Sequence, residues 1–358
     1  IDSYNFEDRK LVEIVKATYF NPKIVVIDET TTALSQEGRE ELYKHMERIR
    51  KSGNTVIFIS HDLPEIIEKS DTITILRDGV YIDTVKSKDV NENDLKKLMV
   101  GREVTGDYYR SDYGEKVSDE VVLSVKNVTV PGLIENVSFD LHKGEILGFG
   151  GLSESGMHEI GKAIFGASYD REGIVELADG TQINDIPTAI KHSIAYTSKD
   201  RDNESVVLNQ SIGDNICLPS LDELSGPAHL ISDKKKKDFA NKFAKQMSVK
   251  MVDVNQFVSN LSGGNKQKVV LARWIGKDSD IVVLDSPTRG IDIKVKQDIY
   301  QLMNQMRKNG KSIIMISEEL MELIGMCDRI MIMKDGKISG ELERDQNLDE
   351  NGLITMMV

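Results

Sequence analysis

The sequence predicts an α/β fold, and it predicts that fold twice. Two short runs of β-branched and apolar residues, typical of buried parallel strands, each end at an aspartate. Residues 24–27 precede Asp28-Glu29, and residues 281–284 precede Asp285-Ser286, which lies 257 positions later. Strand and helix patterns alternate around both runs, which indicates a largely parallel sheet core in each copy. The repeat is a duplicated domain, because the units of solenoid proteins are only roughly 20–50 residues long.

The elements of the first copy follow the strand at residues 24–27. A helix is expected over residues 36–51, where apolar residues recur at helical spacing and Ser52-Gly53 provides the end. Residues 55–59 form the next strand. Pro64 then lies in the first turn of a second helix, where the missing N–H of proline does little harm.

Two further strands, at residues 72–76 and 80–85, flank Asp78-Gly79, which is a hairpin turn signal. The whole order repeats over residues 281–340, with Asp335-Gly336 at the matching turn. The same offset pairs Gly53 with Gly310, Ser60 with Ser317, and His61 with Glu318.

The repeat also predicts the domain boundaries. The second copy opens near residues 121–125, and the last residues, 353–358, resemble 95–100. We therefore expect three segments, namely the C-terminal part of a first domain over residues 1–100, an exposed linker over 101–120, and a complete second domain over 121–358. By the same offset, roughly 136 residues of the first copy would precede Ile1 and are absent.

The composition argues against two classes of protein. The net charge of −13 disfavours a general nucleic-acid binder, which needs a basic face. No apolar run reaches the roughly 18 residues that a membrane-spanning helix requires. Cys217 and Cys327 lack the spacing of a metal site, so we expect them in the core of a protein from a reducing compartment.

The most specific motif is Leu261-Ser262-Gly263-Gly264-Asn265-Lys266-Gln267-Lys268, which precedes a helical run at residues 269–275. Ser262 is expected to cap the helix, and the glycines allow a ligand to approach the backbone. The N-terminus of a helix suits an anion such as phosphate. The alternative is a plain helix cap with a flexible lead-in. The strand and aspartate that follow at residues 280–290 favour the phosphate interpretation.

On these residues the sequence resembles the ATP-binding cassette family. Ser262-Gly263-Gly264 resembles the signature motif, Asp28 and Asp285 resemble Walker B aspartates, and His61 resembles the switch histidine. The resemblance is closest to the tandem-cassette ATPases of ribose-, galactose- and xylose-type sugar importers, with the N-terminal part missing. It rests on the fused repeat and on three segments, namely Thr32-Ala33-Leu34-Ser35 as a D-loop, Pro287-Thr288-Arg289-Gly290-Ile291-Asp292, and Met99-Val100-Gly101-Arg102-Glu103.

The resemblance implies that each nucleotide lies between the Walker A loop of one P-loop NTPase-like cassette and the signature of the other. One composite ATP site would use the missing first Walker A together with Ser262, Gly263, Gly264 and Gln267. Its catalytic residues would be Glu29, which polarises the attacking water, and His61, which contacts the γ-phosphate. Asp28 would hold Mg²⁺ through water. Phosphoryl transfer depends mainly on positioning and on charge stabilisation, so these few groups suffice.

The other composite site is expected to be degenerate. Its Walker A loop corresponds to Gly151-Leu152-Ser153-Glu154-Ser155-Gly156-Met157-His158, in which the glycine spacing of G-x-x-x-x-G-K-[ST] survives. Met157 replaces the lysine, His158 replaces the hydroxyl residue that would bind Mg²⁺, and Glu154 adds a negative charge. The matching signature would be Tyr4-Asn5-Phe6-Glu7-Asp8, which has no glycine.

The losses extend to the catalytic positions of the second copy. Ser286 stands where the first copy has Glu29, and Glu318 stands where it has His61. The Q-loop region, Thr197-Ser198-Lys199-Asp200, contains no glutamine. Since every loss falls on one composite site, we expect one hydrolytic site and one structural site. This chain alone, without the first Walker A, would be inactive as an ATPase.

The resemblance also implies partners and a location. The ATPase would bind peripherally to membrane permease subunits on the cytoplasmic face of the cell membrane, and an extracytoplasmic sugar-binding protein would supply the permease. The missing first half of the same chain would complete the site. No nucleic acid is expected.

Two alternatives stay open. One is a tandem cassette that acts on the ribosome, although such proteins usually keep both sites intact and have a long, basic, helical linker. The other is a non-catalytic fragment.

Overall fold

The structure is a computed structural model that describes residues 6–20, 22–28, 30–34, 36–60, 62–77, 80–100, 108–113, 117–226, 230–291, 293–345 and 348–357. It divides into two compact units. Unit 1 comprises Ile1–Gly106 with Asp292–Lys294, and unit 2 comprises Asp107–Ile291 with Val295–Val358.

Unit 1 contains a parallel pair of strands, β1 (Ile24–Asp28) and β2 (Thr55–Ile59). Val25 and Ile27 face a core that the amphipathic helix α2 (Gln36–Lys51) completes with Leu42, Met46 and Ile49. The remaining elements are α1 (Phe6–Thr18), the 3₁₀ turn η1 (Thr30–Ala33), α3 (Leu63–Lys69), the antiparallel pair β3 (Thr72–Arg77) and β4 (Val80–Lys86), the 3₁₀ turn η2 (Ser87–Asp89) and α4 (Glu92–Val100).

The expected elements of the first copy are present. Asp62 caps α3 by accepting a hydrogen bond from the backbone N–H of Glu65, and Pro64 lies in the first turn, as expected. The turn residues Asp78-Gly79 lie outside the described residues. Their counterparts in unit 2, Asp335 and Gly336, have φ values of 48° and 76°. Positive φ at both central residues is what a two-residue type I′ hairpin requires.

Unit 2 is built around a six-stranded sheet in the order β13-β12-β7-β11-β10-β9, parallel throughout except at β12–β13. Its strands are β7 (Ile146–Gly151), β9 (Ile194–Thr197), β10 (Ile281–Asp285), β11 (Ser312–Ile316), β12 (Arg329–Lys334) and β13 (Lys337–Glu343). β10 and β11 are buried along their whole length, which explains their continuous apolar sequences. A smaller antiparallel sheet, β6-β5-β8, contains β5 (Val121–Val130), β6 (Ile134–His142) and β8 (Glu172–Leu177).

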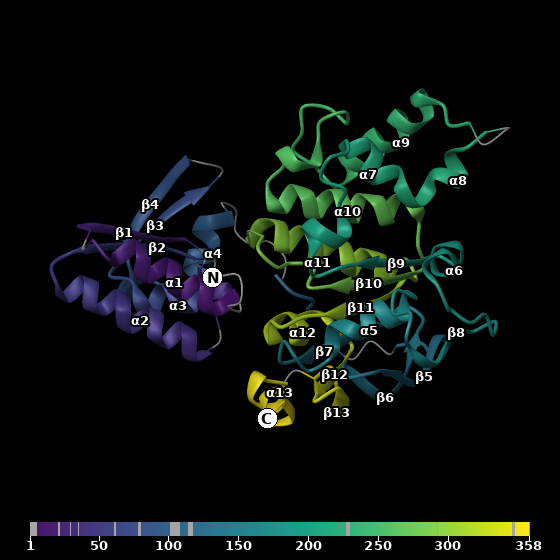
Figure 1. The fold of residues 1–358 in the computed structure, drawn as a ribbon, viewed down its shortest axis with the longest axis horizontal. Helices are drawn as coiled ribbons and strands as arrows, with labels where there is room; N and C mark the ends of the chain where they lie inside the picture. Colours follow the sequence, from purple (N-terminus) through teal and green to yellow (C-terminus); the bar gives the residue numbers. More distant parts are fainter. Residues whose placement is uncertain are drawn as a thin grey trace. The chain divides into compact units, whose positions relative to one another are not determined.

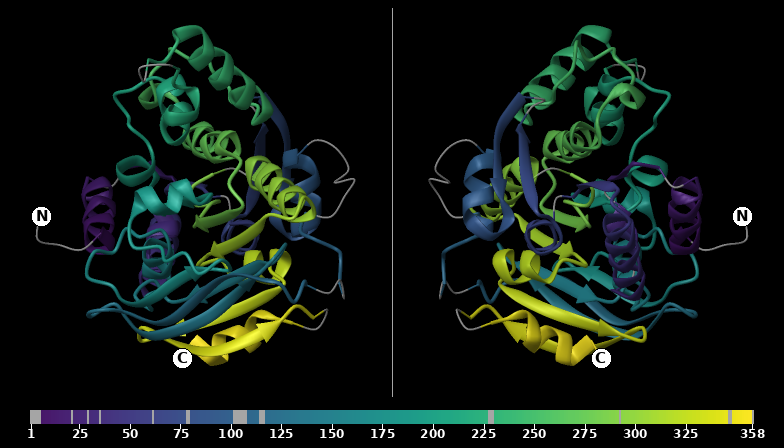
Figure 2. Two further views of the ribbon diagram at one scale, coloured as in Figure 1. Left: turned by 90° about the vertical axis from the view of Figure 1, so that its right-hand side faces the viewer. Right: turned by 90° about the vertical axis from the view of Figure 1, so that its left-hand side faces the viewer.

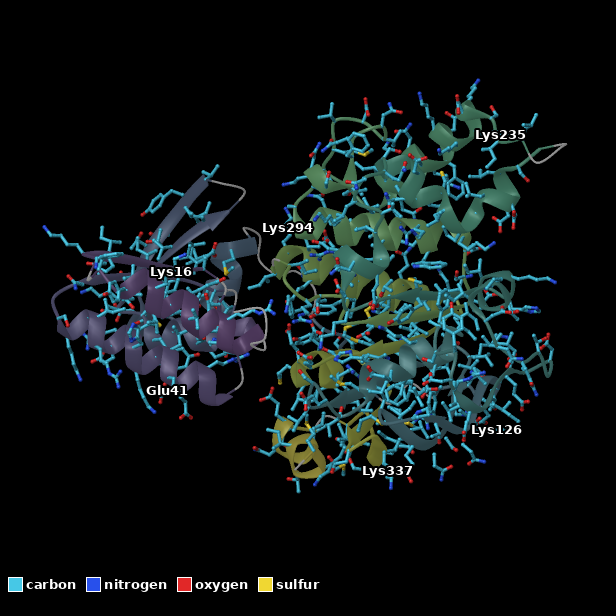
Figure 3. The ribbon with its side chains drawn as sticks, viewed as in Figure 1. Lys16, Glu41, Lys126, Lys235, Lys294 and Lys337 are labelled. Carbon is cyan, nitrogen blue, oxygen red and sulfur yellow. The ribbon has the colours of Figure 1, made fainter. Side chains whose placement is uncertain are left out.

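The helices of unit 2 form two groups. Figures 1 and 2 show the first group, around α7 (Ile212–Cys217), α9 (Asp233–Gln246) and α10 (Gly263–Lys277), at the end of the unit opposite the β6-β5-β8 sheet. Lys235 projects from α9 at this end in Figure 3, as part of an exposed basic run. The other helices and turns are α5 (Met157–Ile164), α6 (Ile186–Lys191), the π-helical turn η3 (Arg201–Ser205), η4 (Leu218–Ser220), α8 (Leu221–Leu224), η6 (Val258–Asn260), α11 (Ile293–Lys308), α12 (Leu320–Met326) and α13 (Glu350–Met357).

The 257-residue repeat is confirmed at the level of whole elements. β1, α2, β2, α3, β3 and β4 begin and end 257 positions before β10, α11, β11, α12, β12 and β13, respectively. The helix α1 begins 257 positions before α10, at Phe6 and Gly263. The same run of secondary structure therefore folds in both units.

The polar stretch after Val100 was expected to be an exposed linker. This expectation is wrong at Arg110, which is only 5% exposed. Arg110 belongs to unit 2, where its guanidinium pairs with Asp112 at 2.9 Å and with Asp328 at 2.6 Å. The ring of Tyr109 lies directly against Gly325, where a Cβ atom would come within 2.3 Å of it. Polar composition failed as a guide here because the arginine is buried together with its counter-ions.

The two cysteines are core residues, as expected. Cys217 and Cys327 are both buried and free of disulfides, and burial raises the pKa of Cys217 to about 11. Among the described residues, no helix combines the length and the apolarity that crossing a bilayer demands.

Candidate functional site

The glycine-rich loop of unit 2 connects β7 to α5, as its sequence spacing indicates. A Cβ atom on Gly151 would lie 2.3 Å from the Ser155 hydroxyl, so only glycine allows the loop to fold back on the strand end. Gly156 has a φ of 89° and forms the N-cap of α5. These constraints explain why both glycines survive although the other P-loop residues do not.

Met157 and His158, the first two residues of α5, take the positions of the P-loop lysine and hydroxyl residue. Met157 has no exposed surface and packs in the main hydrophobic core, so it provides no cation to the loop. The ring of His158 is nearly buried. Its Nδ1 atom lies 2.6 Å from the Oδ1 atom of Asp285, the aspartate that ends β10.

Glu318 connects this pair to the loop. Its Oε1 atom lies 3.3 Å from Nε2 of His158, accepts a hydrogen bond from Lys199 Nζ at 2.7 Å, and accepts another from the Ser153 hydroxyl at 2.8 Å. Lys199 Nζ also lies 3.1 Å from His158 Nε2. We call Ser153, His158, Lys199, Asp285 and Glu318 the loop network. It satisfies the charged groups of this site internally, whereas the hydroxyl of the loop residue Ser155 is buried without a hydrogen-bond partner among the described residues.

The loop network shifts the pKa values of its members. The hydrogen bond with His158, together with those from Lys199 and Ser153, outweighs burial and holds the pKa of Glu318 well below 4.5. Burial and the neighbouring Lys199 ammonium lower the pKa of His158, but the interactions with Asp285 and Glu318 outweigh both and raise the pKa above 6.5. The network therefore favours a protonated imidazole between two carboxylates.

These shifts predict a pH-dependent stability. The charged His158 stabilises unit 2 below pH 6.5, and this contribution is lost as the pH rises through the higher pKa of the folded state. The Glu318 carboxylate stabilises it above pH 4.5, and that contribution is lost as the pH falls through its lower folded-state pKa. Both contributions are present between pH 4.5 and 6.5.

The substitution His158→Gln is therefore expected to lower the free energy of unfolding more at about pH 6 than at about pH 9, by an amount on the order of 1 kcal/mol. Urea unfolding can be followed through the fluorescence of Trp274, the single tryptophan, which is buried in unit 2. An equal loss at both pH values would show that His158 is neutral in the folded protein.

The signature residues Ser262, Gly263 and Gly264 lie at the start of α10, with Gln267 buried one turn later. Ser262 is the N-cap residue, but its hydroxyl makes no capping hydrogen bond to the helix backbone. It accepts instead from the side-chain amide of Asn265 at 3.0 Å. The expected side-chain cap is thus wrong, and a cap without a backbone partner leaves the helix N–H groups available to a ligand.

The candidate catalytic residues of the first copy, Glu29 and His61, lie outside the described residues. Their neighbours are described. Asp28 and Ile59 are register partners at the ends of the parallel strands β1 and β2, so the two segments that continue from these strands start at one edge of the sheet. Of the first copy's signature counterpart, residues 4–5 lie outside the described part, and residues 6–8 are within α1.

Asp28 and Asp285 occupy equivalent positions but differ in their surroundings. The Asp28 side chain is exposed at the end of β1, and within the described part of the chain no hydrogen bond engages its carboxylate. Asp285 is buried, and its carboxylate is bonded to His158 and lies 3.4 Å from the hydroxyl of Tyr196. A hydrated Mg²⁺ ion keeps several of its waters and needs a carboxylate that is free to accept from them, which the bonded Asp285 is not.

Sequence reasoning missed Lys199 and Ser153 as members of the site. In the sequence, Lys199 belongs to a segment that is distinguished only by its lack of a glutamine, and Ser153 is one of several residues in the glycine-rich loop. The available signal was a charge balance, because a carboxylate at position 318 beside a phosphate loop requires a cation. No spacing rule connects positions 153, 199 and 318, since the contacts are tertiary.

Comparison with known proteins agrees with these features. Residues 134–289 match the family model described as ABC transporter. A ribose import ATP-binding protein of Clostridium tetani is 38% identical over 97% of this chain and 68% of the relative. A xylose import ATP-binding protein of Thermoanaerobacter pseudethanolicus is 43% identical, covering 94% of this chain and 68% of the relative.

A solved dimeric ATP-binding cassette with bound ADP and phosphate superposes with a TM-score of 0.55 at 22% identity. The match covers 62% of this chain and 99% of that cassette, and it supports the fold. The sequence identity and coverage of the two import proteins support a more specific assignment than the fold alone. The chain belongs to the ATP-binding cassette family, and within it to the ATP-binding proteins of sugar importers.

Proposed function

We propose that this chain is part of an ATPase subunit that energises the uptake of a monosaccharide or a related small solute through a membrane permease. Residues 1–100 would be the C-terminal part of the first nucleotide-binding domain, 101–120 the connecting segment, in which Arg110 is buried against unit 2, and 121–358 the second domain. One composite ATP site would be competent, with Glu29, His61 and Asp28 acting opposite the signature residues Ser262–Gly264. The other site would be degenerate.

The loop network is the observation that carries this proposal. In unit 2 a carboxylate of the protein itself, that of Glu318, is hydrogen-bonded to the phosphate-type loop through Ser153. The aspartate that would hold hydrated Mg²⁺ is bonded to His158, and no lysine extends from α5 at position 157. A Mg²⁺–nucleotide complex would have to break these bonds, which are charge-assisted and strong. Hence this loop serves as a structural element and the chemistry falls to the other site.

The apolar face of unit 1 supports the assignment of residues 1–100 as part of a larger domain. Val26 and Ile59 are 59% and 44% exposed. Their counterparts 257 positions later, Val283 and Ile316, are buried, and Gly161 of α5 approaches both closely. We propose that the equivalent helix of the first domain, which would follow that domain's own phosphate loop, covers Val26 and Ile59. Such a helix would complete the competent site.

The relatives suggest the partners. Proteins named for ribose and xylose import share 38% and 43% of their aligned residues with this chain. We infer that the ATPase binds permease subunits peripherally at the cytoplasmic face of the membrane, and that an extracytoplasmic binding protein supplies the sugar to the permease. The net charge of −13 favours attachment through protein over attachment through anionic lipid.

The proposal predicts that this chain alone does not hydrolyse ATP above background, because it lacks a phosphate loop able to bind Mg²⁺–ATP productively. Release of inorganic phosphate should be measured for the chain alone and after mixing with the first half of a full-length relative. Activity should appear only in the mixture. Robust hydrolysis by the chain alone would refute the assignment of the active site.

A further inference from the structure

A buried glutamate in unit 1 accepts hydrogen bonds from hydroxyl groups on three separate segments of the chain. The Oε2 atom of Glu65, in α3, accepts hydrogen bonds from Thr31 of η1 at 3.0 Å and from Ser60, which follows β2, at 2.7 Å. Its Oε1 atom accepts from the hydroxyl of Tyr43 in α2. Glu65 and Thr31 are both less than a tenth exposed. We call these four residues the Glu65 cluster.

Unit 2 contains the corresponding cluster 257 positions later, although there the threonine shares a carboxylate oxygen with the tyrosine and not with the serine. Glu322, in α12, is completely buried and accepts a hydrogen bond from Ser317 at 2.7 Å. Thr288 and Tyr300 also donate to its carboxylate. Every member of this Glu322 cluster is the same amino acid as its counterpart in the Glu65 cluster, although the two chain segments differ at many other positions.

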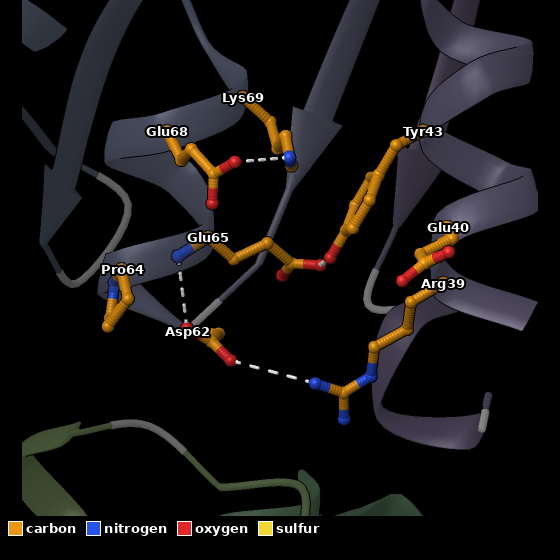
Figure 4. A pocket seen from close by; sticks show the side chains of 8 residues that line it. All are labelled: Arg39, Glu40, Tyr43, Asp62, Pro64, Glu65, Glu68 and Lys69. Carbon is orange, nitrogen blue, oxygen red and sulfur yellow. Dashed lines mark hydrogen bonds and ion pairs between the residues drawn. The ribbon is translucent and has the colours of Figure 1, made fainter. Parts of the chain in front are cut away.

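The surrounding charges repeat as well. In unit 1 the Arg39 guanidinium lies 4.0 Å from the Asp62 carboxylate and also donates to the backbone carbonyl of Thr31 at 3.0 Å. Figure 4 shows Arg39, Asp62, Glu65 and Tyr43 converging on one open pocket. In unit 2, Lys296 pairs with Glu319 at 2.7 Å. A basic residue on the long helix thus meets an acid beside the cluster in both copies.

The Glu65 cluster joins the two segments that carry the candidate catalytic residues. Thr31 is two positions after Glu29, and Ser60 immediately precedes His61. A single oxygen atom of Glu65 accepts from both hydroxyls. The counterpart segments of unit 2 carry Ser286 and Glu318, so there the same cluster holds segments without the catalytic groups.

We propose that Glu65 is a positioning residue for ATP hydrolysis, because it joins the segment after β1 to the segment after β2, and these segments carry the candidate catalytic residues Glu29 and His61. This rests on the function proposed above. Glu322 joins the corresponding segments of unit 2, but those segments carry no catalytic groups. A buried carboxylate that accepts three hydroxyl donors fixes the relative position of three elements, and displacing catalytic groups by about 1 Å can lower a rate about a hundredfold.

The repeat provides a matched control for the test. In the full-length protein, Glu65→Gln and Glu322→Gln each remove one acceptor from an equivalent buried cluster, so both should lower thermal stability to a similar extent. Glu65→Gln is expected to lower kcat about ten- to a hundredfold, with KM for ATP within about threefold of the wild type, since it displaces catalytic groups and not the nucleotide. Glu322→Gln should leave kcat within about threefold.

Thr31→Ser and Thr31→Val provide a second, milder pair. Serine keeps the hydroxyl and should retain the wild-type kcat, whereas valine removes it and should lower kcat, and Thr288→Val in the other copy should not. Assays run below the melting temperature of every variant exclude unfolding as the cause.

The outcomes separate the two proposals. If Glu29→Gln keeps near-normal hydrolysis, the active-site assignment fails and the role of Glu65 fails with it. If Glu29→Gln is inactive but Glu65→Gln and Glu322→Gln have equal kcat values, only the role of Glu65 is overturned. A large kcat loss confined to Glu65→Gln and Thr31→Val supports it.

Discussion

Glu29→Gln in the full-length protein is expected to reduce ATP turnover at least about a hundredfold and to leave nucleotide binding in place. The amide keeps the shape of the side chain but cannot accept a proton from the attacking water, and such general-base contributions amount to roughly 10²–10⁴-fold in rate. The measurements are steady-state phosphate release and, separately, the binding of a fluorescent ATP analogue.

The matched control is Ser286→Glu in the second copy. It restores the missing carboxylate at the equivalent position, 257 residues later. Because Asp285 beside it is still bonded to His158, and Glu318 still occupies the switch position, the substitution should restore little or no second-site turnover. Near-normal hydrolysis by the Glu29→Gln protein, or full rescue of that protein by Ser286→Glu, would contradict the asymmetry between the sites.

The repeated elements could be predicted from the sequence because each carries a local signal. Strands β10 and β11 are uninterrupted apolar segments, and α2 and α11 have apolar residues at helical spacing before a glycine. The hairpin turn at Asp335-Gly336 was predictable because few dipeptides accept positive φ at both positions. Because the domain is duplicated, each of these local sequence signals occurs twice in the chain.

The interior of the degenerate site could not be predicted, since its contacts join residues far apart in the chain. His158 meets Asp285 and Glu318 across 127 and 160 positions. The sequence showed which chemical groups had been lost, but only the structure shows that the replacements bond to one another. The second copy has lost the groups that would contact Mg²⁺ and phosphate, and it has gained the loop network. These are one change, because charges of the protein now pair with one another in place of the charges of a ligand.

The same limit applied to Arg110. The segment around it is polar, which favoured an exposed linker, yet all three nitrogen atoms of its guanidinium donate hydrogen bonds. It donates to Asp112, to Asp328 and to the backbone carbonyl of Met326 at 2.7 Å. Asp328 in turn accepts a hydrogen bond from the backbone N–H of Ile146, the first residue of β7. Arg110 thus fixes the end of α12 and the start of the strand that leads to the glycine-rich loop.

Arg110→Ala is consequently expected to destabilise unit 2 by about 3–5 kcal/mol, because it leaves the nearly buried Asp328 carboxylate without its cation. The measurement is urea unfolding of this chain followed through Trp274, whose ring packs against Phe165 inside unit 2. The control is Lys143→Ala, which breaks an ion pair with Glu120 in which both side chains are more than half exposed. That substitution should change the free energy of unfolding by less than about 1 kcal/mol. Equal effects of the two substitutions would mean that solvent reaches Asp328 in the folded protein, and residues 108–113 would then be a peripheral segment and not part of the core that holds β7.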